Sequence, residues 1–112
     1  MNQETQTPAP SGMNCLLTLA LPQALEEEML DLLRANHDLV PGFSVVPAQG
    51  VGAGASLTTA MENVQGRARR VLVQAVMREA DLDPLLARLR QALDTPGVFY
   101  WAVPLLASGR LG

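Results

Sequence analysis

The sequence has few of the residues that build catalytic and metal centres. Its 112 residues include one cysteine, Cys15, and one histidine, His37. A single cysteine excludes an intrachain disulfide and a cysteine metal cluster. Nothing in the sequence pairs the two residues as a nucleophile and its base. We therefore assign both of them structural or surface roles, and we expect neither catalytic residues nor a metal site. Since no disulfide indicates an oxidising compartment, we take the protein to be cytoplasmic by default.

Charge is scarce as well. Charged residues make up 17% of the chain and the net charge is −3, whereas about 25% of residues are charged in a typical domain. The lack of a domain-wide basic field argues against nucleic acid as a partner. No run approaches the roughly 20 apolar residues that span a bilayer. With 48% hydrophobic residues, the composition predicts either a surface with unusually few charged groups or a surface that is partly covered by another chain.

The apolar segments predict one small domain with the order β-α-β-β-α-β. Strands are expected over 15–21, 42–49, 69–77 and 98–103, and Pro47 makes the second an edge strand because proline has no N–H to donate. One helix begins after Pro22, and the other begins near Asp81 or Asp83. We expect a disordered arm over 1–13 and a single domain over 14–112.

The first and third predicted strands are apolar on both faces. Two helices can cover only one face of a four-stranded sheet, so the other face must be buried against something else. A few hundred Å² of exposed apolar surface, at about 25 cal/mol per Å², is worth several kcal/mol on association. A copy of the chain is the simplest cover, and the sequence therefore predicts a homo-oligomer, most simply a ring.

The segment over about 50–66 is longer than most loops in compact domains, which favours a flexible functional loop. Gly50 and Gly52 allow the backbone to approach a ligand, but they lack the spacing of a dinucleotide fingerprint. The string over 49–52 echoes the phosphate loop of acylphosphatases. That match is interpreted as chance, because no arginine follows the loop closely.

Three arginines end this segment and are the best candidates for a binding site. Arg67 and Arg69 alternate to one side of the predicted strand and Arg70 to the other. Guanidinium groups suit phosphates and carboxylates, and Glu62 would orient them. Ion pairing with Glu62 or with an acidic helix of a neighbouring copy explains the run equally well. The aromatic residues at 99–101 are interpreted as core or interface anchors before stacking residues.

Several motifs, in this order and spacing, resemble the PII-like proteins, and most closely family 3240 of the domains of unknown function. They are Cys15-Leu16-Leu17-Thr18-Leu19, Leu21-Pro22, Leu25-Glu26-Glu27, Gly42-Phe43-Ser44, the run from Glu62 to Arg70, Tyr100-Trp101-Ala102-Val103-Pro104 and Ser108-Gly109-Arg110-Leu111. The resemblance implies an α+β, ferredoxin-like βαββαβ sandwich with a four-stranded antiparallel sheet and two helices on one face. It also implies a trimer with the long loop at each subunit junction.

For function, the resemblance implies a signalling or regulatory protein that binds a small anionic ligand at the subunit junctions and acts on a partner through the 50–66 loop. The ligand would be an adenine nucleotide or another small anion. The ligand-binding residues would be Arg67, Arg69, Arg70, Glu62, Gly50 and Gly52. The alternative is a structural or metal-responsive accessory of a heavy-metal efflux transporter, without nucleotide binding. Two positions depart from the pattern: Val51 replaces a histidine, and no lysine precedes the last strand.

Overall fold

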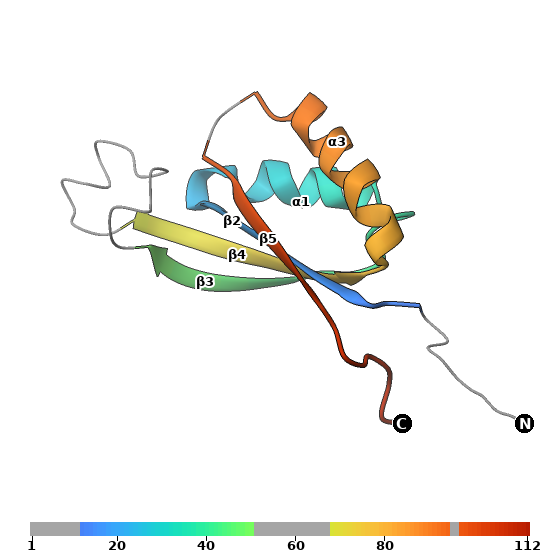
Figure 1. Cartoon of the computed structure of the whole chain (residues 1–112). Coiled ribbons are helices and arrows are strands. Elements are labelled where there is room, and N and C mark those ends of the chain that lie inside the picture. The colour runs from blue at the N-terminus through green and yellow to red at the C-terminus, as the bar shows by residue number, and fades with distance from the viewer. Residues whose placement is uncertain (1–11, 51–67, 95–96) are drawn as a thin grey trace, which may run out of the picture.

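The computed structural model describes residues 12–50, 68–94 and 97–112 (Figure 1). Most of the predicted N-terminal arm and nearly all of the predicted loop lie outside these residues. The elements are β2 (Cys15–Pro22), the 3-10 turn η1 (Gln23–Leu25), α1 (Glu26–Ala35), β3 (Ser44–Gly50), β4 (Ala68–Met77), the 3-10 turn η2 (Glu79–Asp81), α3 (Leu82–Ala92) and β5 (Phe99–Pro104). The predicted order of strands and helices is confirmed.

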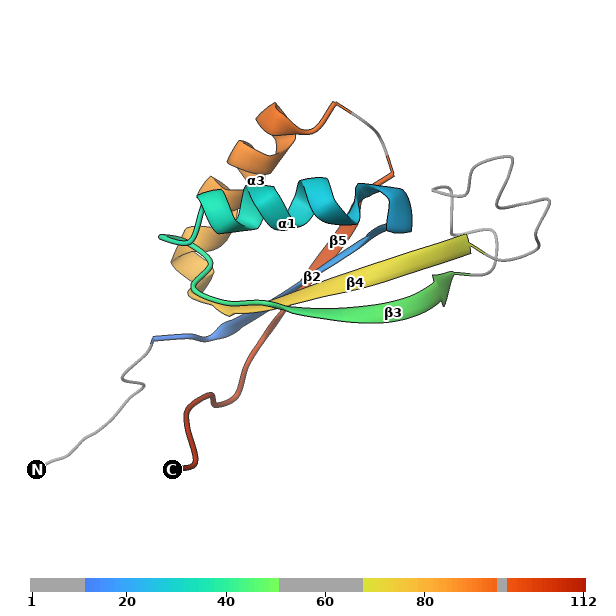
Figure 2. The ribbon, with the colours of Figure 1, turned by 180° about the vertical axis from the view of Figure 1, so that it is seen from behind.

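The strands form one antiparallel sheet in the order β3-β4-β2-β5. Strand β3 lies at the edge of the sheet, as Pro47 predicts. Strands β2 and β4, the two that are apolar on both faces, lie at the centre. Both helices pack on one face of the sheet, and no described element covers the other face (Figures 1 and 2). The predicted ferredoxin-like sandwich is therefore confirmed.

The hydrophobic core lies between the helices and the sheet. Alternate residues of β2 and β4 point into it, because successive side chains of a strand lie on opposite faces. The buried core positions on these strands are Cys15, Leu17, Leu19, Leu21, Val71, Val73, Ala75 and Met77. From the helices, Met29, Leu30, Leu33, Leu85, Leu86 and Leu89 close over them. Each fully buried side chain of this size contributes about 1.5–3 kcal/mol.

Helix α3 begins directly after Asp81, where the sequence predicts. Asp81 occupies the N-cap position but makes no capping hydrogen bond with its side chain. Its carboxylate instead accepts a hydrogen bond from Arg78 Nε at 3.3 Å, because the turn η2 precedes the helix. The Glu79 N–H donates to Asn14 Oδ1 at 2.8 Å, which ties the turn to the start of β2.

Residues 105–112 leave the sheet beside the N-terminal segment. The Leu105 N–H donates to the Asn14 carbonyl at 3.0 Å, and Ser108 Oγ donates to the Met13 carbonyl. These bonds hold the first part of the tail next to residues 13 and 14, whereas Leu111 is fully exposed.

Candidate functional site

The sheet face opposite the helices, here called the open face, carries the candidate site. The strand register places on it Leu16, Thr18, Ala20 and Pro22 of β2, Ser44, Val46 and Ala48 of β3, Arg70, Leu72, Gln74 and Val76 of β4, and Phe99, Trp101 and Val103 of β5. Ten of these fourteen side chains are apolar. Among the described residues of the open face, Arg70 is the only charged one.

The open face exposes large apolar side chains. Val46, Val76, Trp101 and Val103 are each more than a third exposed, and Phe99 is 55% exposed. The rings of Phe99 and Trp101 lie 6.2 Å apart, tilted by 55°. A contiguous apolar surface of this kind usually marks an interaction site. The exposure of Phe99 and Trp101 shows that these two rings are not part of the core, which leaves the roles of interface anchor and stacking residue.

Arg70 is buried and has no acceptor in the described part of the chain. The residue is only 7% exposed, and both Nη1 and Nη2 are buried without a hydrogen-bond partner. Its neighbours in the register are Pro22 on β2 and Ala48 on β3, and neither side chain can accept a hydrogen bond. A buried guanidinium without an acceptor is costly. Arg70 is therefore equipped to bind an anion.

Arg69 lies on the opposite side of β4 and is exposed. Its register partner is Gln49, so its side chain starts on the helix side of the sheet. Arg69 and Arg70 consequently diverge to opposite faces of the sheet, as the alternation predicts, so the site proposed below is built on Arg70 and does not include Arg69. Gly50 ends β3 and pairs with Ala68, one residue before Arg69. The other predicted site residues, Gly52, Glu62 and Arg67, lie outside the described residues.

Cys15 and His37 are separated from this site. Cys15 is buried on the core side, and burial, assisted by the Glu79 carboxylate, raises the pKa of its thiol. A thiol that stays protonated is a poor nucleophile. His37 is exposed just beyond α1, with Nδ1 3.3 Å from the Arg34 carbonyl oxygen. Within residues 12–50, 68–94 and 97–112, no group of three or more histidine, cysteine or carboxylate side chains could hold a metal ion.

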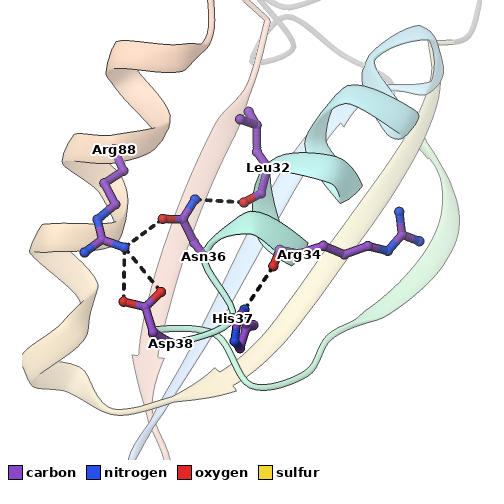
Figure 3. Close-up of polar contacts among 6 residues, drawn as sticks. All are labelled: Leu32, Arg34, Asn36, His37, Asp38 and Arg88. Carbon is purple, nitrogen blue, oxygen red and sulfur yellow. Dashed lines mark hydrogen bonds and ion pairs between the residues drawn. The ribbon is translucent and has the colours of Figure 1, made fainter.

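The most connected polar cluster joins the two helices (Figure 3). Arg88 of α3 donates through Nη1 to Asn36 Oδ1 at 2.8 Å and contacts both Asp38 carboxylate oxygens at 3.3 Å. Asn36 Nδ2 in turn donates to the Leu32 carbonyl at 2.8 Å. The sequence analysis did not identify Asn36 or Arg88 as members of a polar cluster. Since Arg88, Asn36 and Asp38 bond to one another across the two helices, we interpret the cluster as structural.

A groove of about 260 Å³ runs between α3 and β5 on the helix side of the sheet. Its lining is mainly apolar and includes Leu86, Leu89, Val98 and Tyr100, with Arg90 as the charged member. Because it lies on the other face of the sheet from Arg70, it is separate from the candidate anion site.

The family model described as a protein of unknown function, DUF3240, matches residues 11–112. The chain belongs to the DUF3240 family. No curated protein matches it in a sequence comparison. Among the helices that the structure describes, none is long and apolar enough to cross a bilayer.

Solved structures agree with this assignment. A DUF3240 family protein from Shewanella baltica OS155 matches with a TM-score of 0.71 at 19% identity, over 89% of this chain and 98% of that one. CPII, a nitrogen regulatory PII-like protein from Thiomonas intermedia K12 bound to ADP, AMP and bicarbonate, matches with a TM-score of 0.64 at 18% identity, over 88% and 96%. CutA1 from Oryza sativa matches with a TM-score of 0.63 at 14% identity, over 86% and 83%. The predicted PII-like fold is confirmed.

Proposed function

We propose that this DUF3240 protein is a PII-like regulator that binds a small anion at Arg70, at the junction between copies of itself. The observation that carries the proposal is the buried guanidinium, whose Nη1 and Nη2 have no acceptor in the described part of the chain. An isolated buried charge costs several kcal/mol. A bound anion would remove that cost, so the fold itself favours anion binding at this position.

The fold neighbours support an anionic ligand. The CPII structure holds ADP, AMP and bicarbonate, each of which carries negative charge at neutral pH. By this analogy, the ligand class proposed from the sequence, an adenine nucleotide or another small anion, is retained for this chain.

The open face supports self-association. Val46, Val76, Phe99, Trp101 and Val103 are exposed on it, and no described helix covers it (Figure 2). Burying a few hundred Å² of this surface would contribute several kcal/mol at about 25 cal/mol per Å². We propose that a second and a third copy of the chain cover the face, forming the trimer that the PII-like resemblance implies.

The two residues that flank the 51–67 segment lie near the proposed anion site. Strand β3 ends at Gly50 and β4 begins at Ala68, and these two residues pair with each other. Ala68 is two residues before Arg70 on β4, and Gly50 is two residues after Ala48, the register partner of Arg70. A ligand at Arg70 would contact the base of this segment, and we propose that the protein acts on a cytoplasmic partner through it. Glu62, Arg67 and Gly52 would contribute from the same segment.

Thermal unfolding with added ligands tests the proposal. ADP, AMP, sodium bicarbonate and sodium phosphate are added separately to the wild type, to Arg70→Gln and to the matched control Arg69→Gln. We expect at least one anion to raise the Tm of the wild type and of Arg69→Gln but not that of Arg70→Gln. No shift with any anion, or a shift that Arg70→Gln retains, would contradict the proposal. A shift with Ni²⁺ or Co²⁺ alone would favour the efflux accessory.

A further inference from the structure

We propose that the groove between α3 and β5 is a second binding site, which takes a small carboxylic acid with a compact apolar body. The site is independent of Arg70, because the groove lies on the helix side of the sheet and its lining does not include that residue. Two observations carry the proposal. The groove is a mainly apolar hollow of about 260 Å³. Two polar groups on its lining, the Arg90 guanidinium and the Tyr100 hydroxyl, have no hydrogen bond or ion pair within the described part of the chain.

The groove exists because α3 does not close over the edge strand. Strand β5 lies at the edge of the sheet, and its Tyr100 pairs with Leu19 of β2, so that both side chains start on the helix side. Leu19 is 2% exposed, whereas Tyr100 is 41% exposed. The helices therefore cover β2 and leave β5 open at this position. Burying the open face would not fill the groove, since the two lie on opposite sides of the sheet.

The lining favours a small apolar body. Aliphatic side chains from α3, from the residue after it and from the start of β5 supply most of the surface, namely Leu86, Leu89, Leu93 and Val98. Small-molecule sites are usually concave and mostly apolar, with a few polar groups that fix the orientation of the ligand. A volume of about 260 Å³ equals that of about nine water molecules in the liquid. The groove therefore suits a ligand of about ten non-hydrogen atoms, which is smaller than a nucleotide.

The polar groups indicate the charge of the ligand. Arg90 is the only charged residue among the described residues that line the groove, and its planar N–H fork matches the two oxygens of a carboxylate. The Tyr100 hydroxyl is a further donor. Arg90 lies in the last turn of α3, where the helix dipole is negative. That dipole accounts for an arginine at a helix end, but it would repel an anion, so binding of a carboxylate here depends on Arg90.

NMR titration of the isotope-labelled full chain at neutral pH and constant ionic strength tests the proposal. The probes are sodium benzoate, its uncharged isostere benzamide, and sodium acetate, which lacks the apolar body. We expect benzoate to shift the signals of Leu89 and Val98 with a Kd of about 1 mM or below. Benzoate should bind about fivefold more tightly than benzamide, the upper range for an exposed ion pair, and acetate should leave these signals unchanged.

Two substitutions locate the carboxylate. Arg90→Gln should bind benzoate and benzamide with equal affinity. The matched control Arg34→Gln, in the last turn of α1, should keep the preference for benzoate. The titration is repeated in Arg70→Gln, which separates the groove from the proposed anion site, and we expect the shifts of Leu89 and Val98 to be unchanged there.

Several outcomes would overturn the proposal. These are the absence of saturable shifts at the groove, equal affinity of the wild type for benzoate and benzamide, or a preference for benzoate that Arg90→Gln retains. Benzoate binding that only Arg70→Gln abolishes would assign the ligand to the anion site, which would support the proposed function and remove the second site. Affinity that falls as the protein concentration rises would identify a second copy of the chain as the occupant. Conversely, benzoate binding at the groove without any Tm shift by ADP, AMP, bicarbonate or phosphate would leave this site standing and remove the proposed function.

Discussion

Replacing Arg70 with methionine should stabilise the folded chain in the absence of a binding anion. In the wild type, Nη1 and Nη2 are buried without an acceptor, and the residue is 7% exposed. Methionine has a long, flexible, uncharged side chain that suits a position between Pro22 and Ala48. The substitution therefore removes an uncompensated charge and retains most of the packing.

The expected gain follows from the cost of burying charge. Replacing buried ionic groups by apolar residues of similar volume has stabilised proteins by about 1–4 kcal/mol. The lower end of this range applies where water still reaches part of the ionic group. Because Arg70 is almost fully buried, we expect a stabilisation above that lower end. For a domain of this size, each kcal/mol shifts the Tm by about 4–8 °C. We expect an increase of at least about 4 °C for Arg70→Met.

Urea unfolding followed by circular dichroism gives the free energy at matched protein concentration, which matters because association also stabilises the folded state. Sodium acetate should stabilise the wild type and narrow its difference from Arg70→Met. The control Arg69→Met should stay within about 0.5 kcal/mol of the wild type, as exposed substitutions usually do. If Arg70→Met is less stable than the wild type without acetate, the guanidinium is satisfied in solution and the reasoning fails.

Three further predictions concern other parts of the fold. Arg88→Ala should lower the free energy of unfolding by about 0.5–1.5 kcal/mol in urea titrations, because the contacts to Asn36 and Asp38 are lost. The control Arg34→Ala, at the exposed pair with Asp31, should lower it less. Equal losses in the two variants would contradict the structural role of the Arg88 cluster. Leu85→Ala should cost about 2–5 kcal/mol because the side chain is fully buried, whereas Leu106→Ala should leave stability unchanged. Because burial raises the pKa of the Cys15 thiol, the folded chain should lose stability as the pH rises above about 8.5, the ordinary pKa of a cysteine. Cys15→Ala should flatten this alkaline decline. Iodoacetamide should alkylate the native thiol far more slowly than the urea-unfolded one.

The strands and their faces were predictable because the signals that define them are local. Alternation along β4 separates Val71 and Val73 from Leu72, and the structure places the first two in the core. Pro47 predicted an edge strand because proline has no N–H to donate to a neighbouring strand. The apolar character of both faces of β2 correctly indicated that one sheet face would lack a helix cover.

Contacts between distant segments could not be predicted in this way. The bond from Arg88 to Asn36 joins residues that only the packing of α3 on α1 brings together, and no local pattern in the sequence indicates it. Likewise, alternation separated Arg69 from Arg70 but could not distinguish the exposed guanidinium from the buried one. That difference depends on what lies beside each residue on neighbouring strands, which the register supplies and a single sequence does not.

The chemistry available among the described residues of the open face favours anion binding. Proton transfer needs a group that changes its charge near neutral pH, and the arginine guanidinium does not. Covalent catalysis needs an activated nucleophile, yet Cys15 lies on the core side with a raised thiol pKa. What the face offers is one fixed positive charge and the rings of Phe99 and Trp101. A charge that is always present can hold an anion in place, as the proposed function requires.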